Sequence, residues 1–115
     1  MKDSISTHVL DTTSGRPAAG LTVRLEALGS DGQWMEVTHG ATDVNGRISN
    51  LLGGDGIVPD GMYRMTFDVG DYFRSHGHAS IYRQIPVVFV VDEHDGSFHI
   101  PLLLSPNGYT TYRGK

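Results

Sequence analysis

The sequence predicts an all-β protein, a two-sheet antiparallel β-sandwich with one short helix. Three features of the 115 residues indicate this class. Apolar and polar side chains alternate with a period of two along several short segments, as in strands that have one buried face. Dipeptides that favour tight turns separate these segments. The segments are also short and regularly spaced, which is typical of a sandwich.

The composition fits one globular domain, which we place at residues 1–115. Hydrophobic residues make up 38% of the chain and charged residues 19%, so a core is expected rather than disorder. Nine Lys and Arg against 13 Asp and Glu give a net charge of −4, which argues against a nucleic-acid partner. The absence of cysteine excludes disulfides, thiolate zinc sites and cysteine nucleophiles.

The chain shows no membrane or secretory signal. Its N-terminus, MKDSISTHVL, lacks the apolar region of a signal peptide. No stretch approaches the ~20 apolar residues of a membrane-spanning helix. We therefore expect a cytoplasmic protein without a membrane partner.

The first two thirds of the chain contain the clearest alternation. Strands are predicted at residues 6–11, 21–27 and 62–69. The only helical candidate is Asp71 to His78, which is short. Two turns are expected between the strands, at Asp31-Gly32 and Asn45-Gly46.

Residues 86–91 (PVVFVV) are apolar on both faces, which indicates a central or interface strand. Residues 98–104 alternate less strictly. The Asp95-Gly96 turn lies between the two segments, so we predict that they pair as a hairpin.

The last strand is expected at residues 109–113, paired back across an Asn107-Gly108 turn. Pro101 lies inside the preceding strand and has no N–H to donate to a ladder. We therefore expect a bulge or a local gap in the pairing at Pro101.

Three polar residues at strand positions or turns are candidates for catalysis: His8, Arg47 and His99. An imidazole with a pKa of ~6.5 can take a proton from water and return one to a leaving nitrogen. A guanidinium favours negative charge on carbonyl oxygens. Taken singly, each residue fits a structural role better, but together they predict a site that hydrolyses a planar, electron-poor heterocycle.

An activated water is the expected nucleophile, because no serine lies in a G-x-S-x-G motif. His76-x-His78 offers two ring nitrogens to a metal. No cysteine and no third ligand at a suitable spacing support such a site, so we expect no metal. His39 and His94 are weaker candidates for any chemistry.

The C-terminal segment, HIPLLLSPNGYTTYRGK, is the most informative part of the chain. Chain ends are usually frayed and chemically inert. Here Tyr112, Arg113 and Gly114 follow directly on a hairpin. A phenol, a guanidinium and a flexible glycine at this place can bring a cation and hydrogen-bond donors into a cleft.

This segment resembles the His-x-Pro-Leu-Leu-x-Ser-Pro…Tyr-x-Thr-Tyr-Arg-Gly motif of the hydroxyisourate hydrolases, the transthyretin-related enzymes of urate breakdown. Transthyretin shares their fold, but its hormone-binding form lacks this combination of His, Arg and Tyr-Arg-Gly. The similarity therefore favours the enzyme branch. It extends over nearly the whole chain, through Thr7–Asp11, Gly15–Ala18, Thr42–Arg47 and Pro86–Phe89.

The resemblance implies a transthyretin-like sandwich that opens the ring of 5-hydroxyisourate without a metal or an organic cofactor. His8 and His99 would handle the water and the departing ring nitrogen, and Arg47 would clamp substrate carbonyls. Residues 112–114 would line the same cleft and bind the substrate. The family forms homotetramers, with sites in a channel where two dimers meet.

One departure and two alternatives stand beside this interpretation. Lys115 occupies the position of the family's terminal serine, which places a long cation beside the carboxyl terminus. A transthyretin-like module that binds a small ligand without turnover is the first alternative. A plain β-sandwich interaction domain is the second, and the missing signal and polar last strand argue against it.

Overall fold

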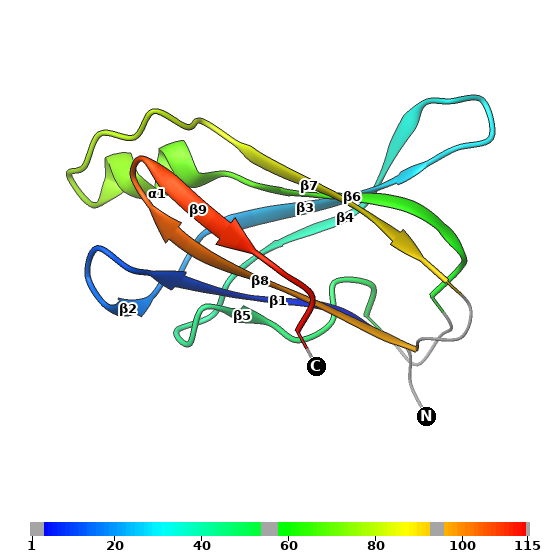
Figure 1. Cartoon of the computed structure of the whole chain (residues 1–115), viewed down its shortest axis with the longest axis horizontal. Coiled ribbons are helices and arrows are strands. Elements are labelled where there is room, and N and C mark those ends of the chain that lie inside the picture. The colour runs from blue at the N-terminus through cyan, green and yellow to red at the C-terminus, as the bar shows by residue number, and fades with distance from the viewer. Residues whose placement is uncertain (1–3, 54–57, 93–95, 115) are drawn as a thin grey trace.

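The computed structural model describes residues 4–53, 58–92 and 96–114. They form two stacked β-sheets, which confirms the predicted sandwich (Figure 1). The first sheet has the order β2-β1-β8-β9, with β5 also paired to β1; the strands are β1 (Ser4–Asp11), β2 (Arg16–Pro17), β5 (Arg47–Ile48), β8 (Ser97–Ser105) and β9 (Gly108–Thr111). The second has the order β4-β3-β6-β7; the strands are β3 (Thr22–Leu28), β4 (Trp34–Ala41), β6 (Gly61–Phe67) and β7 (Ile85–Val91).

The core lies between the sheets and follows the predicted alternation. Every second residue of β1 is buried, from Ile5 to Asp11. The period-two pattern is likewise confirmed in β3 and β6, which present their apolar sides to the first sheet. The largest fully buried side chains are Phe67, Phe73, Ile5, Leu21, Leu25, Met65, Ile85, Leu102 and Leu104.

The short helix α1 spans Val69–Ser75, two residues earlier than its predicted start. It ends before the predicted boundary because Gly77 adopts a φ of 78°, a left-handed conformation that stops a helix. Tyr72 and Phe73 anchor α1 to the core. No helix in the described part of the chain is long and apolar enough to cross a membrane.

The predicted hairpin between β7 and β8 is wrong, because the two strands lie in opposite sheets. β7 pairs with β6, and β8 pairs with β1 and β9. The rings of Phe89 and Phe98 meet across the sandwich, with centroids 6.4 Å apart. Stacking the strands buries the apolar side of each against the other, whereas a hairpin would align them in one layer.

β7 is an edge strand and not a central one. Its outward residues Val88 and Val90 are 53% and 64% exposed. Pro86 is tolerated there because an edge strand leaves some N–H positions unpaired. The alternative interpretation, a strand at a subunit interface, stays a prediction.

The first sheet is not purely antiparallel, since β1 and β8 run parallel without interruption from Ser4 to Asp11. The gap expected at Pro101 occurs on the other side of β8. The antiparallel ladder with β9 ends at Leu102↔Thr111 and resumes only as a single bridge between His99 and Gly114. The missing N–H of Pro101 accounts for the interruption.

A buried polar pair joins α1 to the first sheet. The Tyr72 hydroxyl donates to Asp11 Oδ2 at 2.9 Å, and Asp11 is only 3% exposed. Burial, together with the hydrogen bond to Asp11, raises the pKa of Tyr72 to about 12. The neutral phenol therefore persists as the donor over the whole physiological range.

We expect Tyr72→Phe to lower the free energy of unfolding by about 1–3 kcal/mol, because Asp11 Oδ2 loses its partner while remaining buried. Urea unfolding at fixed protein concentration measures the change. Tyr109→Phe serves as the matched control, since the Tyr109 side chain is exposed and its hydroxyl has no hydrogen bond among the described residues. Equal stability of the two variants would contradict the prediction.

Candidate active site

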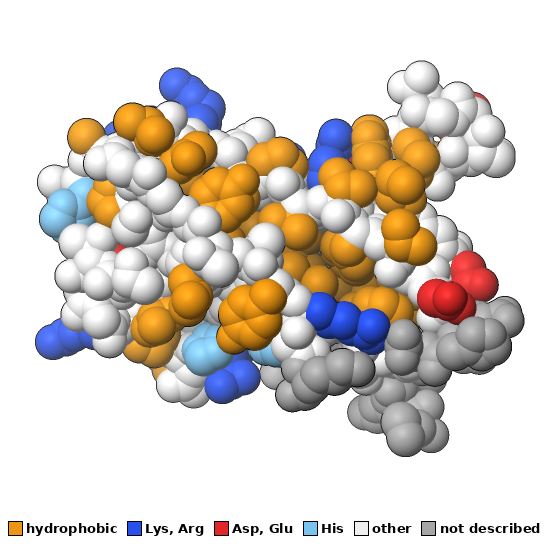
Figure 2. Space-filling view, viewed as in Figure 1, with side chains coloured by type: hydrophobic (Ala, Val, Ile, Leu, Met, Phe, Trp, Pro, Cys, Tyr) orange, Lys and Arg blue, Asp and Glu red, His pale blue; other side chains and the backbone are white. Residues whose placement is uncertain are grey.

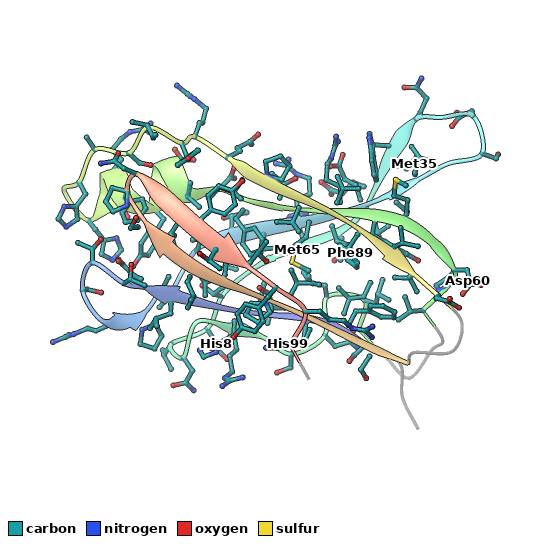
Figure 3. All side chains as sticks on the ribbon, in the orientation of Figure 1. His8, Met35, Asp60, Met65, Phe89 and His99 are labelled. Carbon is teal, nitrogen blue, oxygen red and sulfur yellow. The ribbon has the colours of Figure 1, made fainter. Side chains whose placement is uncertain are left out.

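The two catalytic histidines predicted from the sequence lie together on the outward face of the first sheet. Because Thr7 and Val9 point into the core, their neighbours Ser6 and His8 point outward. The parallel register places Ser6 beside His99, and His8 beside Pro101. Figure 3 shows the two imidazoles next to each other on the same side of the ribbon.

Arg47 reaches the same face from β5. It pairs directly with His8, so the two side chains project from the same side of the sheet. Figure 2 shows histidine side chains adjoining basic and hydrophobic groups along this margin of the molecule. The structure therefore brings together all three residues that the sequence marked as candidate catalytic groups.

The turn before Arg47 explains how it is held. Asp43 Oδ1 accepts the backbone N–H groups of Asn45 at 2.9 Å and of Arg47 at 3.0 Å. The hydrogen bond from the Arg47 N–H lowers the pKa of Asp43 most, the bond from Asn45 lowers it further, and the carboxylate stays ionised. Gly46 has a φ of 73°, and a Cβ there would lie 2.4 Å from the Val9 carbonyl oxygen. Only glycine lets the turn lie this close to β1.

His99 has contacts on both edges of its ring. Its Nδ1 lies 2.8 Å from Ser6 Oγ. On the opposite edge, a Cβ on Gly114 would lie 2.4 Å from His99 Cδ2, so a side chain is excluded there. The Gly114 N–H donates to the His99 carbonyl oxygen at 2.8 Å.

The electrostatic setting of His99 favours the neutral imidazole. Burial lowers its pKa, and the positive charge of Arg47 and the neighbouring His8 lower it further. A neutral ring has a free lone pair for a proton. This is the state that general-base chemistry requires near pH 7.

The three predicted substrate-binding residues are placed differently from one another. Gly114 lies against the His99 ring, and Tyr112, two residues earlier, is 54% exposed. The Arg113 guanidinium instead lies 4.4 Å from the centre of the Phe98 ring, and its Nη2 donates to the Ser97 carbonyl oxygen at 3.2 Å. Their roles stay predictions, and Lys115 lies outside the described residues.

Ser6 is the neighbour of His99 that sequence reasoning missed. The sequence does show that Ser6 shares a strand face with His8, because the two are separated by two positions. Its partner, however, is His99 and not His8. That contact depends on the pairing of β1 with β8, which no local pattern reveals.

The described residues contain no group of three His, Asp or Glu side chains that could hold a metal ion. His76 Nδ1 lies 2.8 Å from the Tyr72 carbonyl oxygen, and its ring packs on the Tyr72 ring. His39 is bonded to Glu36. His94 lies outside the described residues.

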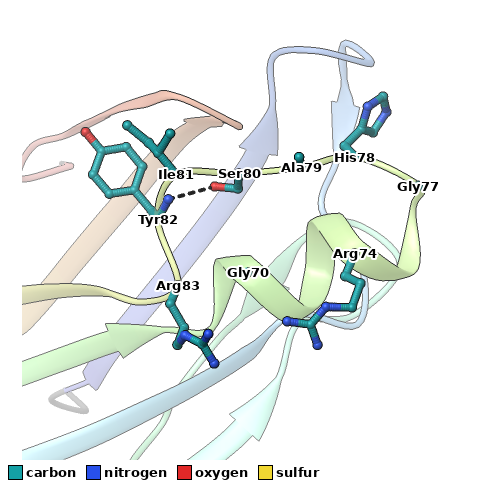
Figure 4. A pocket seen from close by; sticks show the side chains of 9 residues that line it. All are labelled: Gly70, Arg74, Gly77, His78, Ala79, Ser80, Ile81, Tyr82 and Arg83. Atoms are coloured by element: carbon teal, nitrogen blue, oxygen red, sulfur yellow. Dashed lines mark hydrogen bonds between the residues drawn. The ribbon is translucent and has the colours of Figure 1, made fainter.

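A separate hollow of about 580 Å³ lies between α1 and the loop that follows it (Figure 4). None of the predicted site residues lines it. Arg74 and Arg83 lie on one side, while His78 and Tyr82 point away from them. Arg74 is already bonded to Asp71 at 3.1 Å. The polar groups therefore do not converge on a reacting position as they do around His99.

Comparison with known proteins gives a consistent result. The HIUase/Transthyretin family profile matches residues 5–114. A 5-hydroxyisourate hydrolase of Mus musculus is 46% identical over 96% of this chain and 93% of its own. The structure of the Klebsiella pneumoniae 5-hydroxyisourate hydrolase superposes with a TM-score of 0.84 at 33% identity, covering 97% of this chain and 99% of that one. The structure of transthyretin from Sparus aurata superposes with a TM-score of 0.91 at 32% identity, covering 98% of this chain and 97% of that one.

We expect the pKa of His99, measured by NMR titration, to lie below the ~6.5 of a free imidazole. Arg47→Gln should raise this pKa, because the cation that opposes protonation is removed. Arg74→Gln removes an equal charge from α1 and should leave it unchanged. An unaltered His99 pKa in the Arg47 variant would show that the two groups do not interact.

Proposed function

Because the chain belongs to the HIUase/Transthyretin family, we propose that it is a hydrolase that converts 5-hydroxyisourate to 2-oxo-4-hydroxy-4-carboxy-5-ureidoimidazoline, a step of urate degradation. The observation that carries the proposal is the convergence of His8, His99 and Arg47 on one outward sheet face. The relatives named for this reaction align over nearly the whole chain.

The proposed reaction uses water as the nucleophile. The water oxygen bonds to a ring carbonyl carbon while a histidine takes one of its protons. The ring C–N bond then breaks, its electron pair stays on the nitrogen, and a proton is delivered there. The products are a carboxylate and a ureido group in one molecule, so atoms and charges balance without a cofactor.

His99 is the better candidate for the base. Burial and Arg47 lower its pKa, which keeps a lone pair available at neutral pH. We assign His8 to the other proton transfer, to the leaving nitrogen. Its place beside Arg47 and near His99 allows both steps to occur on one bound substrate.

Arg47 supports the charge that develops on the substrate. A guanidinium offers paired N–H donors to carbonyl oxygens and stabilises the oxyanion that forms when water adds. The Asp43 turn fixes the backbone from which Arg47 projects. Tyr112, Arg113 and Gly114 complete the proposed substrate-binding wall.

A ligand-binding role without turnover is the second candidate, because the fold superposes on transthyretin at least as well as on the hydrolase. The structure of a sea bream transthyretin in complex with thyroxine superposes with a TM-score of 0.88 at 31% identity. A binding module needs no neutral imidazole beside a guanidinium. The environment of His99 therefore favours the enzyme.

We further propose that the active unit is a homotetramer. The site is an open sheet face in a single chain, and a facing subunit would convert it into a cleft. Exposed Val88 and Val90 on edge strand β7 offer an apolar surface for subunit contact. Assembly would also exclude bulk water from the substrate.

The activity is tested by generating 5-hydroxyisourate in place with uricase and following its ultraviolet absorbance. We expect the protein to accelerate the decay, with or without prior dialysis against a chelator. His8→Ala, His99→Ala and Arg47→Ala should each lower turnover by about 10²–10⁴, the usual cost of losing a proton-transfer or charge-stabilising group. A rate equal to spontaneous decay would favour the binding module.

The assembly is tested by sedimentation velocity at micromolar concentration. Four chains of 12.5 kDa should give a particle of about 50 kDa. Val90→Glu should shift the distribution toward smaller species, because a buried carboxylate without a partner is costly. Met35→Glu, at a 63% exposed position on β4, is the control. A wild-type monomer would remove the intersubunit cleft from the proposal.

A further inference from the structure

We propose that Ser6 is a positioning residue that fixes the His99 ring and presents its Nε2 to the substrate. The expected effect on kcat rests on the proposed function. The contact between Ser6 and His99 can be measured independently of that function. It assigns a role to a side chain outside the set of His8, Arg47, His99 and the C-terminal residues. The hydroxyl acts through His99 and does not need to touch the substrate.

The geometry of an imidazole defines what Ser6 does. Nδ1 and Cδ2 are the two ring atoms next to Cγ, and Cε1 and Nε2 form the distal tip. Ser6 Oγ lies 2.8 Å from Nδ1, and Gly114 closes the Cδ2 edge. With both proximal edges held, the orientation of the distal tip, which carries Nε2, is restrained.

The two restraints differ in kind. Gly114 blocks motion sterically, because its Cα already lies close to the ring and leaves no room for a Cβ. Ser6 supplies the attraction on the other edge, through a hydrogen bond of ordinary length. Loss of the hydroxyl would therefore remove one of the two restraints on the ring and leave the steric one.

The hydrogen bond also decides which nitrogen meets the substrate. A neutral imidazole has one N–H and one lone pair, and a hydroxyl can bond to either. Nδ1 is occupied by Ser6 in both cases. Nε2 has no hydrogen bond to any of the described residues, which leaves it as the nitrogen available for proton transfer.

Ser4 provides a built-in comparison. It lies two residues before Ser6 on β1 and faces the same side of the sheet. Among the described residues its hydroxyl bonds only to the Ser97 hydroxyl, at 3.4 Å. Ser4→Ala therefore removes the same atom from the same strand face without touching a histidine.

The experiment compares Ser6→Ala, Ser6→Thr and Ser4→Ala by steady-state kinetics and by long-range ¹H–¹⁵N spectra of ¹⁵N-labelled histidine. We expect Ser6→Ala to lower kcat about 3- to 10-fold with little change in KM, because one hydrogen bond to the catalytic ring is lost. Ser6→Thr, which retains a hydroxyl, should restore most of the rate. Ser4→Ala should match the wild type.

The spectra separate this inference from the proposed function. In Ser6→Ala the His99 Nδ1 resonance should shift while that of His8 stays in place, and Ser6→Thr should restore it. This result supports the positioning role even if the protein proves inactive on 5-hydroxyisourate. An unshifted Nδ1 resonance, or a kcat loss that Ser6→Thr does not rescue, would overturn it.

Discussion

The parallel pairing of β1 with β8 is the constraint on which the site depends. Its register sets Ser6 beside His99 and His8 beside Pro101. Because side chains alternate across a sheet, a slip of one residue would turn one strand's imidazole toward the core and expose its buried partners. The apolar inner residues of both strands oppose any such slip. Core packing between the two sheets thus fixes the position of polar groups that lie outside it.

Two interruptions of regular strand pairing place further residues beside the histidines of β1 and β8. The Asp43–Gly46 turn lies against β1 because glycine permits the contact, and it delivers Arg47 opposite His8. On the other side, Pro101 cannot donate to β9, so the last strand leaves the ladder after Thr111. The chain returns at Gly114, where one backbone bond holds it to His99. The regular ladder thus carries the two histidines, and the irregular positions add Arg47 and Gly114 beside them.

The sequence predicted those features that depend on local pattern. Alternation located most strands, the missing N–H of Pro101 predicted the gap, and the Asn45-Gly46 dipeptide, which favours a tight turn, predicted the turn before Arg47. Local pattern did not predict which of the two sheets each strand joins. Adjacent apolar segments at residues 86–91 and 98–104 suggest a hairpin, and only the burial of both against each other selects stacking. The Ser6–His99 contact was hidden for the same reason, since it joins residues 93 positions apart.

The proposed chemistry also explains why a guanidinium belongs beside two imidazoles. Before reaction, the charge of Arg47 opposes protonation of His99 and so preserves a base. When water adds to the substrate, a negative charge develops close to the guanidinium and offsets its field. Protonation of His99 then becomes easier, because the substrate oxyanion neutralises the Arg47 charge that opposed the imidazolium. In this proposal the charge of Arg47 keeps His99 neutral in the free protein and stabilises the oxyanion that forms when His99 takes the proton.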